Sequence, residues 1–167
     1  METILIAADH AGFELKRELI PFMRDLGYAV RDMGAFEFDA EDDYPEFIAP
    51  LAQEISESGG TNRGIVIGGS GQGEAIVANR FPHVRAAVFN GQYEPRDGRV
   101  IPHEIIIARE HNDANVLSLG SRFLSVKDAK EAVKTWLTTP FSGDARHVRR
   151  LEKIDGLHVS QRGSGKN

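Results

Sequence analysis

A glycine-rich segment at residues 68–73 carries the strongest chemical signal in this sequence of 167 residues. It reads Gly-Gly-Ser-Gly-Gln-Gly, is followed by Glu74, and joins an apolar run at residues 64–67 to a predicted helix. Glycines at such a junction expose backbone N–H groups at a helix N-terminus, which favours an anion or a developing oxyanion. A tight strand-to-helix turn with Glu74 stabilising the helix dipole also fits, and the loop alone leaves both interpretations open.

Two nucleotide-binding motifs do not fit this loop. A phosphate-binding P-loop has a lysine after its last glycine, and Glu74 at that position would repel a triphosphate. The dinucleotide fingerprint follows the first strand and has a small third residue, whereas this loop follows the third predicted strand. A flavodoxin-like or nucleotide-binding module is therefore disfavoured.

Two histidine-containing pairs could also carry chemistry. Asp9-His10 follows the first predicted strand, and His111-Asn112 ends a predicted helix. Each pair taken alone is also explained by helix capping. No cluster of His, Asp and Glu has metal-ligand spacing, and the acidic stretch at residues 39–43 lacks the central glycine of a calcium loop. We interpret that stretch as a solvated loop and expect no metal ion.

A basic cluster near the C-terminus contains Arg146, His147, Arg149, Arg150 and Lys153. Arg146 and Arg150 are four residues apart, so on a helix they repel each other by a few tenths of a kcal/mol. A phosphate bound between them would reverse that cost. A solvated helix or an intersubunit face of salt bridges is the alternative.

The elements that position these groups follow from hydrophobic periodicity and from glycine and proline. The predicted strands cover residues 3–8, 28–32, 63–67, 85–89 and 116–119. The predicted helices cover residues 12–26, 45–58, 74–80, 103–112, 126–137 and 145–154. Pro21 predicts a kink or an early end of the first helix.

Apolar strands that alternate with helices predict an α/β protein. We expect a three-layer α/β/α Rossmann-like fold with a five-stranded parallel sheet. One domain covers residues 1–155, and residues 156–167 form a flexible tail. Ligands of such sheets bind at the carboxyl ends of the strands, which groups Asp9, the glycine-rich loop and the Gly120-Ser121-Arg122 segment.

Composition limits the function further. The chain has a formal net charge of -5, which argues against a nucleic-acid partner. It contains no cysteine, so disulfides, thiolate catalysis and Cys-ligated metals are excluded. No apolar run is long enough for a membrane helix, and the N-terminus predicts a first strand instead of a signal peptide. We expect a cytoplasmic protein without cofactors and without membrane contact.

Seven segments in order resemble one family, that of type B ribose-5-phosphate isomerases and galactose-6-phosphate isomerase subunits. They are Asp9-His10-Ala11-Gly12-Phe13, Asp43-Tyr44-Pro45, residues 68–74, Ala78-Asn79, Arg109-Glu110-His111-Asn112, Gly120-Ser121-Arg122 and Arg146-His147-Val148-Arg149-Arg150. The resemblance runs from about Ile4 to Ile154. It implies an aldose–ketose isomerase of a sugar phosphate, with ribose 5-phosphate as the first candidate substrate.

The family has two branches, one with a cysteine base at the first residue of the glycine-rich loop and one with a glutamate at its end. Gly68 and Glu74 place this chain in the glutamate branch. The resemblance then implies a cis-enediolate mechanism with four catalytic residues: Glu74, Ser70, His111 and Asp9. It implies that the substrate is bound by His10, Tyr44, Gly69, Gly71, Gly73, Asn112, Arg122, Arg146 and Arg150.

The resemblance also implies a homodimer with shared active sites, or a tetramer built from it. The loop at residues 90–102 is longer than expected in this family, so we hypothesise that it reshapes the sugar pocket or the dimer contact. An isomerase of allose 6-phosphate or galactose 6-phosphate is therefore one alternative. A non-catalytic sugar-phosphate-binding protein on the same fold is another.

Overall fold

Five parallel strands form one sheet in the computed structural model, which describes residues 2–98, 100 and 103–162 and the side chains of these residues as far as residue 157. The strands are β1 (Thr3–Ala8), β2 (Ala29–Asp32), β3 (Arg63–Gly68), β4 (Ala86–Phe89) and β5 (Val116–Gly120). Their order in the sheet is β2-β1-β3-β5-β4, and every pairing is parallel.

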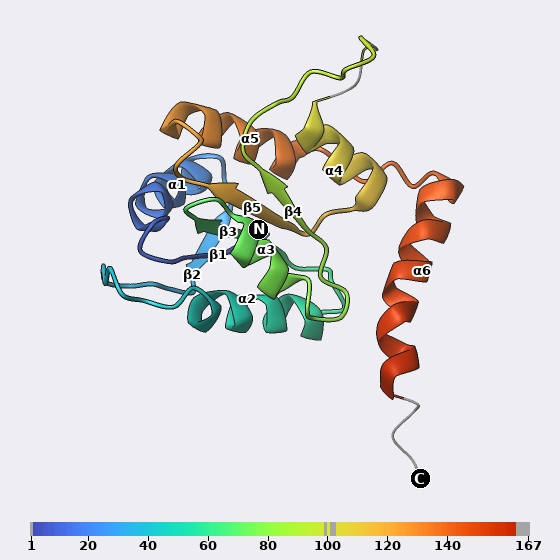
Figure 1. The fold of residues 1–167 in the computed structure, drawn as a ribbon, viewed down its shortest axis with the longest axis horizontal. Helices are drawn as coiled ribbons and strands as arrows, with labels where there is room; N and C mark the ends of the chain where they lie inside the picture. Colours follow the sequence, from blue (N-terminus) through green and yellow to red (C-terminus); the bar gives the residue numbers. More distant parts are fainter. Residues whose placement is uncertain (1, 99, 101–102, 163–167) are drawn as a thin grey trace.

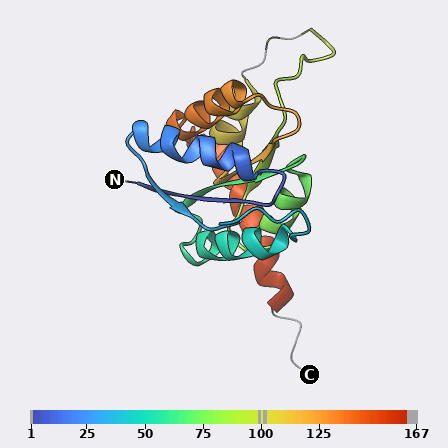
Figure 2. The ribbon, with the colours of Figure 1, turned by 90° about the vertical axis from the view of Figure 1, so that its left-hand side faces the viewer.

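Helices cover both faces of this sheet (Figures 1 and 2). They are α1 (Phe13–Asp25), α2 (Pro45–Glu57), α3 (Gln72–Ala78), α4 (Glu104–Asn112), α5 (Val126–Thr138) and α6 (Ala145–Arg162). Helices α1, α4 and α5 lie on one face, and α2 and α3 lie on the other. The predicted three-layer fold with five parallel strands is confirmed.

Two hydrophobic cores fill the space between the sheet and its helices. Side chains of a strand alternate between faces, so Ile4 and Ile6 pack toward α1 and α5, whereas Leu5 packs toward α2. Trp136 of α5 is fully buried, and its indole Nε1–H donates to the carbonyl of Ala114 at 3.1 Å. This continuous burial explains why the strands are apolar without interruption.

The order in which strands are added to the sheet reverses between β1 and β3. From β1 the chain leads outward to β2 at one edge, and it then returns to build β3 on the other side of β1. Such a switch point leaves a crevice at the carboxyl ends of the two central strands, where α/β proteins bind ligands. Asp9 follows β1 and the glycine-rich loop follows β3, so both lie at this crevice.

Two predictions about helices differ from the structure. Helix α1 continues through Pro21 to Asp25, so the predicted early end is wrong. Pro21 and Arg17 are both exposed, so water can bind the Arg17 carbonyl that loses its donor. Helix α6 continues to Arg162, eight residues beyond the predicted end at Ile154. A flexible tail stays a prediction, and its last residues, 163–167, lie outside the described residues.

The described residues between β4 and α4 project from the body of the protein (Figure 1). Helix α6 lies at the side of that body, away from the edge strand β2. The segment between β4 and α4 contains the predicted loop at residues 90–102, of which residues 90–98 and 100 are described. Within the described part of the chain, no helix combines the length and the apolar character that crossing a bilayer requires.

Candidate active site

The carboxyl edge of the sheet brings together most of the predicted site residues. Asp9 is buried, and its carboxylate accepts a hydrogen bond from the Gly12 N–H at 3.0 Å. Gly12 itself lies against the carbonyl of Ile67, where a Cβ would overlap with the backbone. The start of α1 can therefore approach the end of β3 closely, and this holds Asp9 beside the glycine-rich loop.

Glu74 is the buried carboxyl group of this edge, with 4% of its surface exposed. Burial raises the pKa of Glu74 above its ordinary value, the negative charge of Asp9 raises it further, and the Glu74 N–H opposes this shift. The carboxyl group lies directly against Gly68, where any side chain would overlap with it. The fold thus holds a carboxyl group with raised pKa in a space that only a glycine leaves open.

Carbonyl groups of the glycine-rich loop are bound by groups at β5. The Gly68 carbonyl accepts from the Ser121 N–H at 2.8 Å, and the Gly69 carbonyl accepts from the Arg122 N–H at 3.1 Å. The Ser118 hydroxyl donates to the Gly71 carbonyl at 2.6 Å. Gly71 has a φ of 73°, a left-handed conformation that glycine adopts without strain. The loop is therefore fixed from the β5 side.

The backbone N–H groups of this loop are available to a ligand. Within the described residues, those of Gly69, Ser70 and Gly71 make no hydrogen bond. In a trans peptide the C=O of one residue and the N–H of the next point in opposite directions, so the Gly68 and Gly69 carbonyls direct the N–H groups of Gly69 and Ser70 away from β5. The Glu74 carboxyl group lies against Gly68 at the end of β3, so these N–H groups are candidate donors for an oxyanion beside it.

Tyr44 and Arg122 cover two glycines of the same loop. A Cβ on Gly73 would lie 2.8 Å from Cζ of Tyr44, and a Cβ on Gly69 would lie 3.1 Å from Cζ of Arg122. The lack of side chains at both glycines thus admits an aromatic ring and a guanidinium group. Arg122 supplies a positive charge at this edge of the sheet.

His10 is paired with Asp42, which corrects the interpretation of residues 39–43 as a solvated loop at this one residue, since the other four are exposed. The His10 ring and its backbone N–H both contact Oδ1 of Asp42, at 2.6 Å from Nδ1 and 3.1 Å from the backbone nitrogen. Only 6% of the Asp42 side chain is exposed. The hydrogen bond to Asp42 raises the pKa of His10, and Asp9 adds to this, while burial and Arg122 oppose it.

Replacing Asp42 with Asn is expected to lower the pKa of His10 toward its ordinary value, because a neutral amide stabilises the imidazolium less than a carboxylate does. A titration of the His10 ring by ¹⁵N NMR measures this shift. The matched control is Glu41→Gln, which removes one charge from an exposed neighbour. Equal His10 pKa values in wild type and Asp42→Asn would contradict the pairing.

Asp9, His10 and Asp42 also bring three potential metal-ligand atoms within 4.8 Å of one another, which their sequence spacing did not indicate. Each of these groups already has a protein partner, namely the Gly12 N–H for Asp9 and the mutual pair for the other two. Hydrogen bonds explain the approach of the three side chains, while Oδ2 of Asp42 is buried without a hydrogen-bond partner among the described residues.

Four predicted site residues do not lie at this edge. His111 and Asn112 end α4, shortly before β5, and the start of β5 lies beside the start of β3. They therefore lie at the amino edge of the sheet. Because β5 has five residues, it spans roughly 15 Å, and that length separates them from Glu74.

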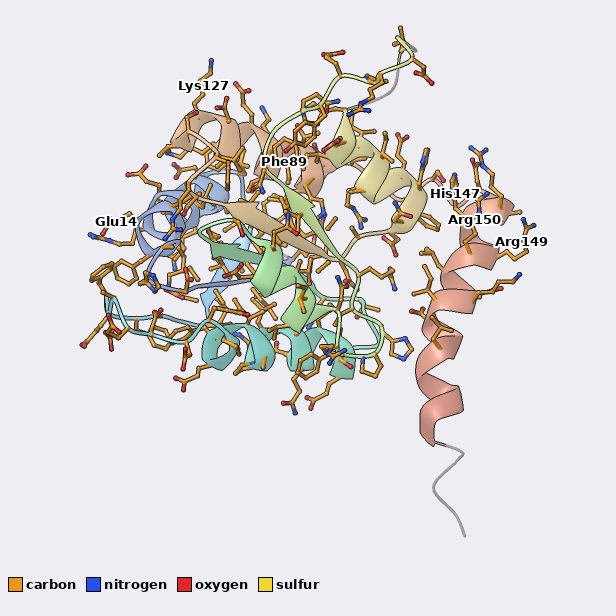
Figure 3. The ribbon with its side chains drawn as sticks, viewed as in Figure 1. Glu14, Phe89, Lys127, His147, Arg149 and Arg150 are labelled. Carbon is orange, nitrogen blue, oxygen red and sulfur yellow. The ribbon has the colours of Figure 1, made fainter. Side chains whose placement is uncertain are left out.

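Arg146 and Arg150, the other two residues, are exposed on α6. Figure 3 shows Arg150 on α6, well separated from Phe89 at the carboxyl end of β4. The buried His147 ring stacks on His111 with centroids 4.4 Å apart, and this contact fixes α6 against α4. Within a single chain, four predicted site residues therefore lie away from the carboxyl edge: His111, Asn112, Arg146 and Arg150.

A separate cavity of about 680 Å³ lies at the amino edge, beside α6. It is lined by three arginines, but carboxylates already pair with them. Arg63 binds Glu2, and both Arg85 and Arg109 bind Asp113. The cavity therefore offers no unpaired positive charge to an anion and is not a second candidate for the anion site.

Sequence reasoning missed three residues of the site: Asp42, Ser118 and Asn90. Asp42 belongs to an acidic run whose members look equivalent, and nothing in the sequence indicates which one turns inward. Ser118 lies within a predicted strand, and Asn90 lies at the start of a predicted loop. All three act through contacts between residues 20 or more positions apart, which periodicity does not reveal.

The carboxyl edge therefore combines the buried Glu74 carboxyl group with unpaired loop N–H groups, the Arg122 guanidinium and His10, whose pKa is raised. A carboxylate beside donors for a developing oxyanion can remove a proton from a carbon next to a carbonyl group. Arg122, and His10 in its protonated form, can bind an anionic end of the same molecule.

Comparisons with known proteins agree with this chemistry. The profile of the family described as Ribose/Galactose Isomerase matches residues 4–154. Ribose-5-phosphate isomerase B of Mycobacterium tuberculosis is 38% identical over 150 residues, which cover 89% of this chain and 85% of that protein. The Escherichia coli K12 protein of the same name is 34% identical over 157 residues, covering 94% and 97%.

Solved structures give the same result. Ribose-5-phosphate isomerase B of Clostridium thermocellum superposes with a TM-score of 0.82 at 40% identity, covering 95% of this chain and 99% of that one. The Mycoplasma genitalium protein of the same name, solved with bound ribulose 5-phosphate, superposes with a TM-score of 0.82 at 33% identity, covering 94% and 96%.

Proposed function

The chain belongs to the Ribose/Galactose Isomerase family, so it is a sugar-phosphate isomerase, and we propose that it converts ribose 5-phosphate to ribulose 5-phosphate without a metal ion. The observation that carries this proposal is the buried Glu74 carboxyl group beside unpaired N–H groups of the glycine-rich loop. Two relatives named ribose-5-phosphate isomerase B, each covering most of the chain, support the choice of sugar.

The reaction is a proton transfer between two carbons. Glu74 removes the proton from C2 of the open-chain aldose, the electron pair forms the C1=C2 double bond, and O1 becomes negative. The N–H groups of Gly69 and Gly71 stabilise that oxyanion. A hydroxyl proton moves from O2 to O1 with Ser70 as the relay, and Glu74 returns its proton to C1. The product is the ketose, and no electrons leave the substrate.

The space around Gly68 supports Glu74 as the base. In the other branch of the family the base is a cysteine at that position. Here the Glu74 carboxyl group lies where a side chain at Gly68 would have to lie. Both bases would therefore act from the same place, which supports Glu74 in the role that cysteine has in the other branch.

We propose that a second copy of the chain completes each site. His111, Asn112, Arg146 and Arg150 serve ring opening and phosphate binding in the family, yet they lie far from Glu74 within one chain. Asn112 lines an apolar groove of about 560 Å³ at α6 and the edge strand β4, which also includes Ile154 and Leu157. Asn79 also lines this groove, and Ile76, three residues earlier in the chain, is 65% exposed on α3. A partner docked here would bury these apolar groups.

Kinetics with three sugars test the function. The purified protein is incubated with ribose 5-phosphate, allose 6-phosphate or galactose 6-phosphate in the presence of EDTA, and NMR follows the ketose product. We expect ribose 5-phosphate to react fastest and EDTA to leave the rate unchanged. A higher kcat/KM for a six-carbon sugar would reassign the substrate, and tight binding without turnover of any sugar would favour a non-catalytic binding protein.

The loop at residues 90–102 is the part of the chain most able to change that preference. Its described residues project beyond the body of the protein (Figure 1), and Gln92 closes its base by accepting a hydrogen bond from the Glu104 N–H at 2.7 Å. Replacing residues 93–101 with a short Gly-Ser linker keeps this closure. We expect a changed ratio of kcat/KM among the three sugars, or a weaker dimer by sedimentation. If neither changes, the hypothesis about the loop is wrong.

A further inference from the structure

Asn90 connects the end of β4 to the glycine-rich loop. Its side-chain Nδ2 donates to the carbonyl of Ser70 at 2.9 Å, across 20 positions of sequence. A carbonyl oxygen only accepts, so the nitrogen end of the Asn90 amide must face Ser70. The position of Asn90 directly after β4, a strand of the sheet, gives this donor a rigid support.

This contact determines the direction of one backbone N–H group. In the trans peptide between Ser70 and Gly71, the carbonyl of the first residue and the N–H of the second point in opposite directions. Asn90 holds the Ser70 carbonyl toward β4, at the far side of β5 from β3. The Gly71 N–H is therefore directed away from β4, toward the side on which the Glu74 carboxyl group lies against Gly68 at the end of β3.

The two preceding peptides have backbone donors, but this one depends on a side chain. The carbonyls of Gly68 and Gly69 accept from the main chain of Ser121 and Arg122, and only a proline would remove those donors. The Ser70 carbonyl accepts from Asn90 alone among the described residues. Among these three peptides, the Ser70–Gly71 peptide is therefore the one that a side-chain substitution can release.

The surroundings of Asn90 show that this bond carries a cost. Its Oδ1 is buried without a hydrogen-bond partner among the described residues, which destabilises a fold. Gly120 makes the room, since a Cβ there would overlap with the Asn90 amide and lie 2.9 Å from the Ser70 carbonyl oxygen. An apolar side chain at residue 90 would avoid the unpaired oxygen but would leave the Ser70 carbonyl without its donor, so the amide serves the Ser70 carbonyl.

We propose that Asn90 is a positioning residue of the isomerase reaction: through the Ser70 carbonyl it orients the Gly71 N–H toward the oxyanion of the enediolate. This inference rests on the proposed function, because it assigns the anion that the Gly71 N–H receives. Asn90 itself does not touch the substrate. It acts on the intermediate more than on the bound sugar, since the negative charge on O1 develops only during the reaction.

The test uses Asn90→Ala and the nearly isosteric Asn90→Asp in the full-length protein. Loss of one oxyanion donor lowers kcat by about 100- to 1,000-fold. A donor that is present but misdirected, as in Asn90→Ala, is expected to lower kcat by about 10- to 100-fold. KM should change less than about threefold. The affinity for a hydroxamate that mimics the enediolate should fall in parallel with kcat/KM. Asn90→Asp should be impaired as well, because its carboxylate repels the Ser70 carbonyl.

Asn79→Ala is the matched control. Asn79 also ties its loop to β4, with hydrogen bonds of its side chain to the carbonyl and the N–H of Ala86 at 3.0 and 2.8 Å. It lies at the opposite end of α3, away from Ser70. We expect Asn79→Ala to lower thermal stability and to leave the ratio of hydroxamate affinity to substrate affinity unchanged. Asn90 variants that behave like this control overturn the proposal.

An NMR measurement separates this inference from the proposed function. The amide signal of Gly71 is followed while the hydroxamate is titrated into wild type and Asn90→Ala. A large shift in the wild type that is lost in the variant supports the inference even if none of the three sugars turns over. An equal shift in both proteins, or no shift of Gly71 in the wild type, overturns it.

Discussion

Replacing Glu74 with Gln is expected to lower kcat by about 1,000- to 10,000-fold, because the amide cannot accept a proton from carbon. KM should change far less, since the groups proposed to bind the phosphate are intact. Steady-state kinetics with ribose 5-phosphate measure both constants. Glu46→Gln is the control, since Glu46 also lies in the first turn of a helix but is exposed on α2. A Glu74→Gln enzyme within tenfold of wild-type kcat would contradict a base at this position.

The pH dependence of wild type provides a second readout of the same group. A base must be ionised, so kcat falls when the pH drops below the pKa of Glu74. Burial raises that pKa above the ordinary value of 4.5, and the acid limb should therefore lie at a higher pH than an exposed carboxyl would give. An acid limb that is unchanged in the residual activity of Glu74→Gln would assign it to another group.

The stability of Glu74→Gln shows whether its loss of activity comes from unfolding. A carboxyl group with raised pKa in the folded state destabilises the fold when it is ionised. Its favourable contribution is complete below the unfolded pKa and is lost as the pH rises through the folded pKa. At neutral pH the neutral Gln is therefore expected to raise the melting temperature, and this gain should shrink as the pH falls toward 4.5.

Mixing two inactive variants is expected to restore activity if each site is shared between subunits. One variant is Glu74→Gln, and the other is the double variant Arg146→Ala/Arg150→Ala, whose substituted side chains are exposed. Loss of two charge-assisted phosphate contacts should lower kcat/KM by about 100-fold or more. In a purified heterodimer one site receives both defects and the other receives none, so about half of the wild-type activity should return.

A reversed pairing controls for this result. A chain with all three substitutions is combined with a wild-type chain, and the heterodimer is purified through two different tags. If the sites are shared between subunits, each of the two sites then has one defect, and the heterodimer should be nearly inactive. In unshared sites the wild-type chain would keep its own intact site, so activity in this heterodimer and none in the first would show that each chain works alone.

Much of the fold could be predicted because the signals are local. The strand at Thr3–Ala8 is a continuous apolar run, and its predicted bounds match β1. Local signals failed at Pro21, where an exposed face allows the helix to continue, and beyond Ile154, where the polar residues of α6 gave no clear end. Long-range packing and solvent exposure decided these two cases.

The site was predictable in part for a related reason. Glu74, Ser70 and the glycines belong to one continuous motif, and Asp9 joins them because parallel strands end at one edge. The burial of Asp42 depends on how a long loop folds back onto His10, which composition does not encode. The separation of His111 and Arg146 from Glu74 could not be seen in the sequence either, because motif order along the chain does not show which edge of the sheet a residue occupies.

Deuterium incorporation tests the proposed mechanism most directly. Wild type and Glu74→Gln are incubated with ribose 5-phosphate in heavy water containing EDTA, and proton NMR follows exchange at the C2 position together with product formation. The mechanism predicts that wild type introduces solvent deuterium and forms ribulose 5-phosphate, and that both processes slow by about 1,000-fold or more in the variant. Turnover or exchange that persists at the wild-type rate in Glu74→Gln would contradict a proton transfer through Glu74, whereas turnover without solvent deuterium would show that Glu74 returns the same proton before it exchanges with water.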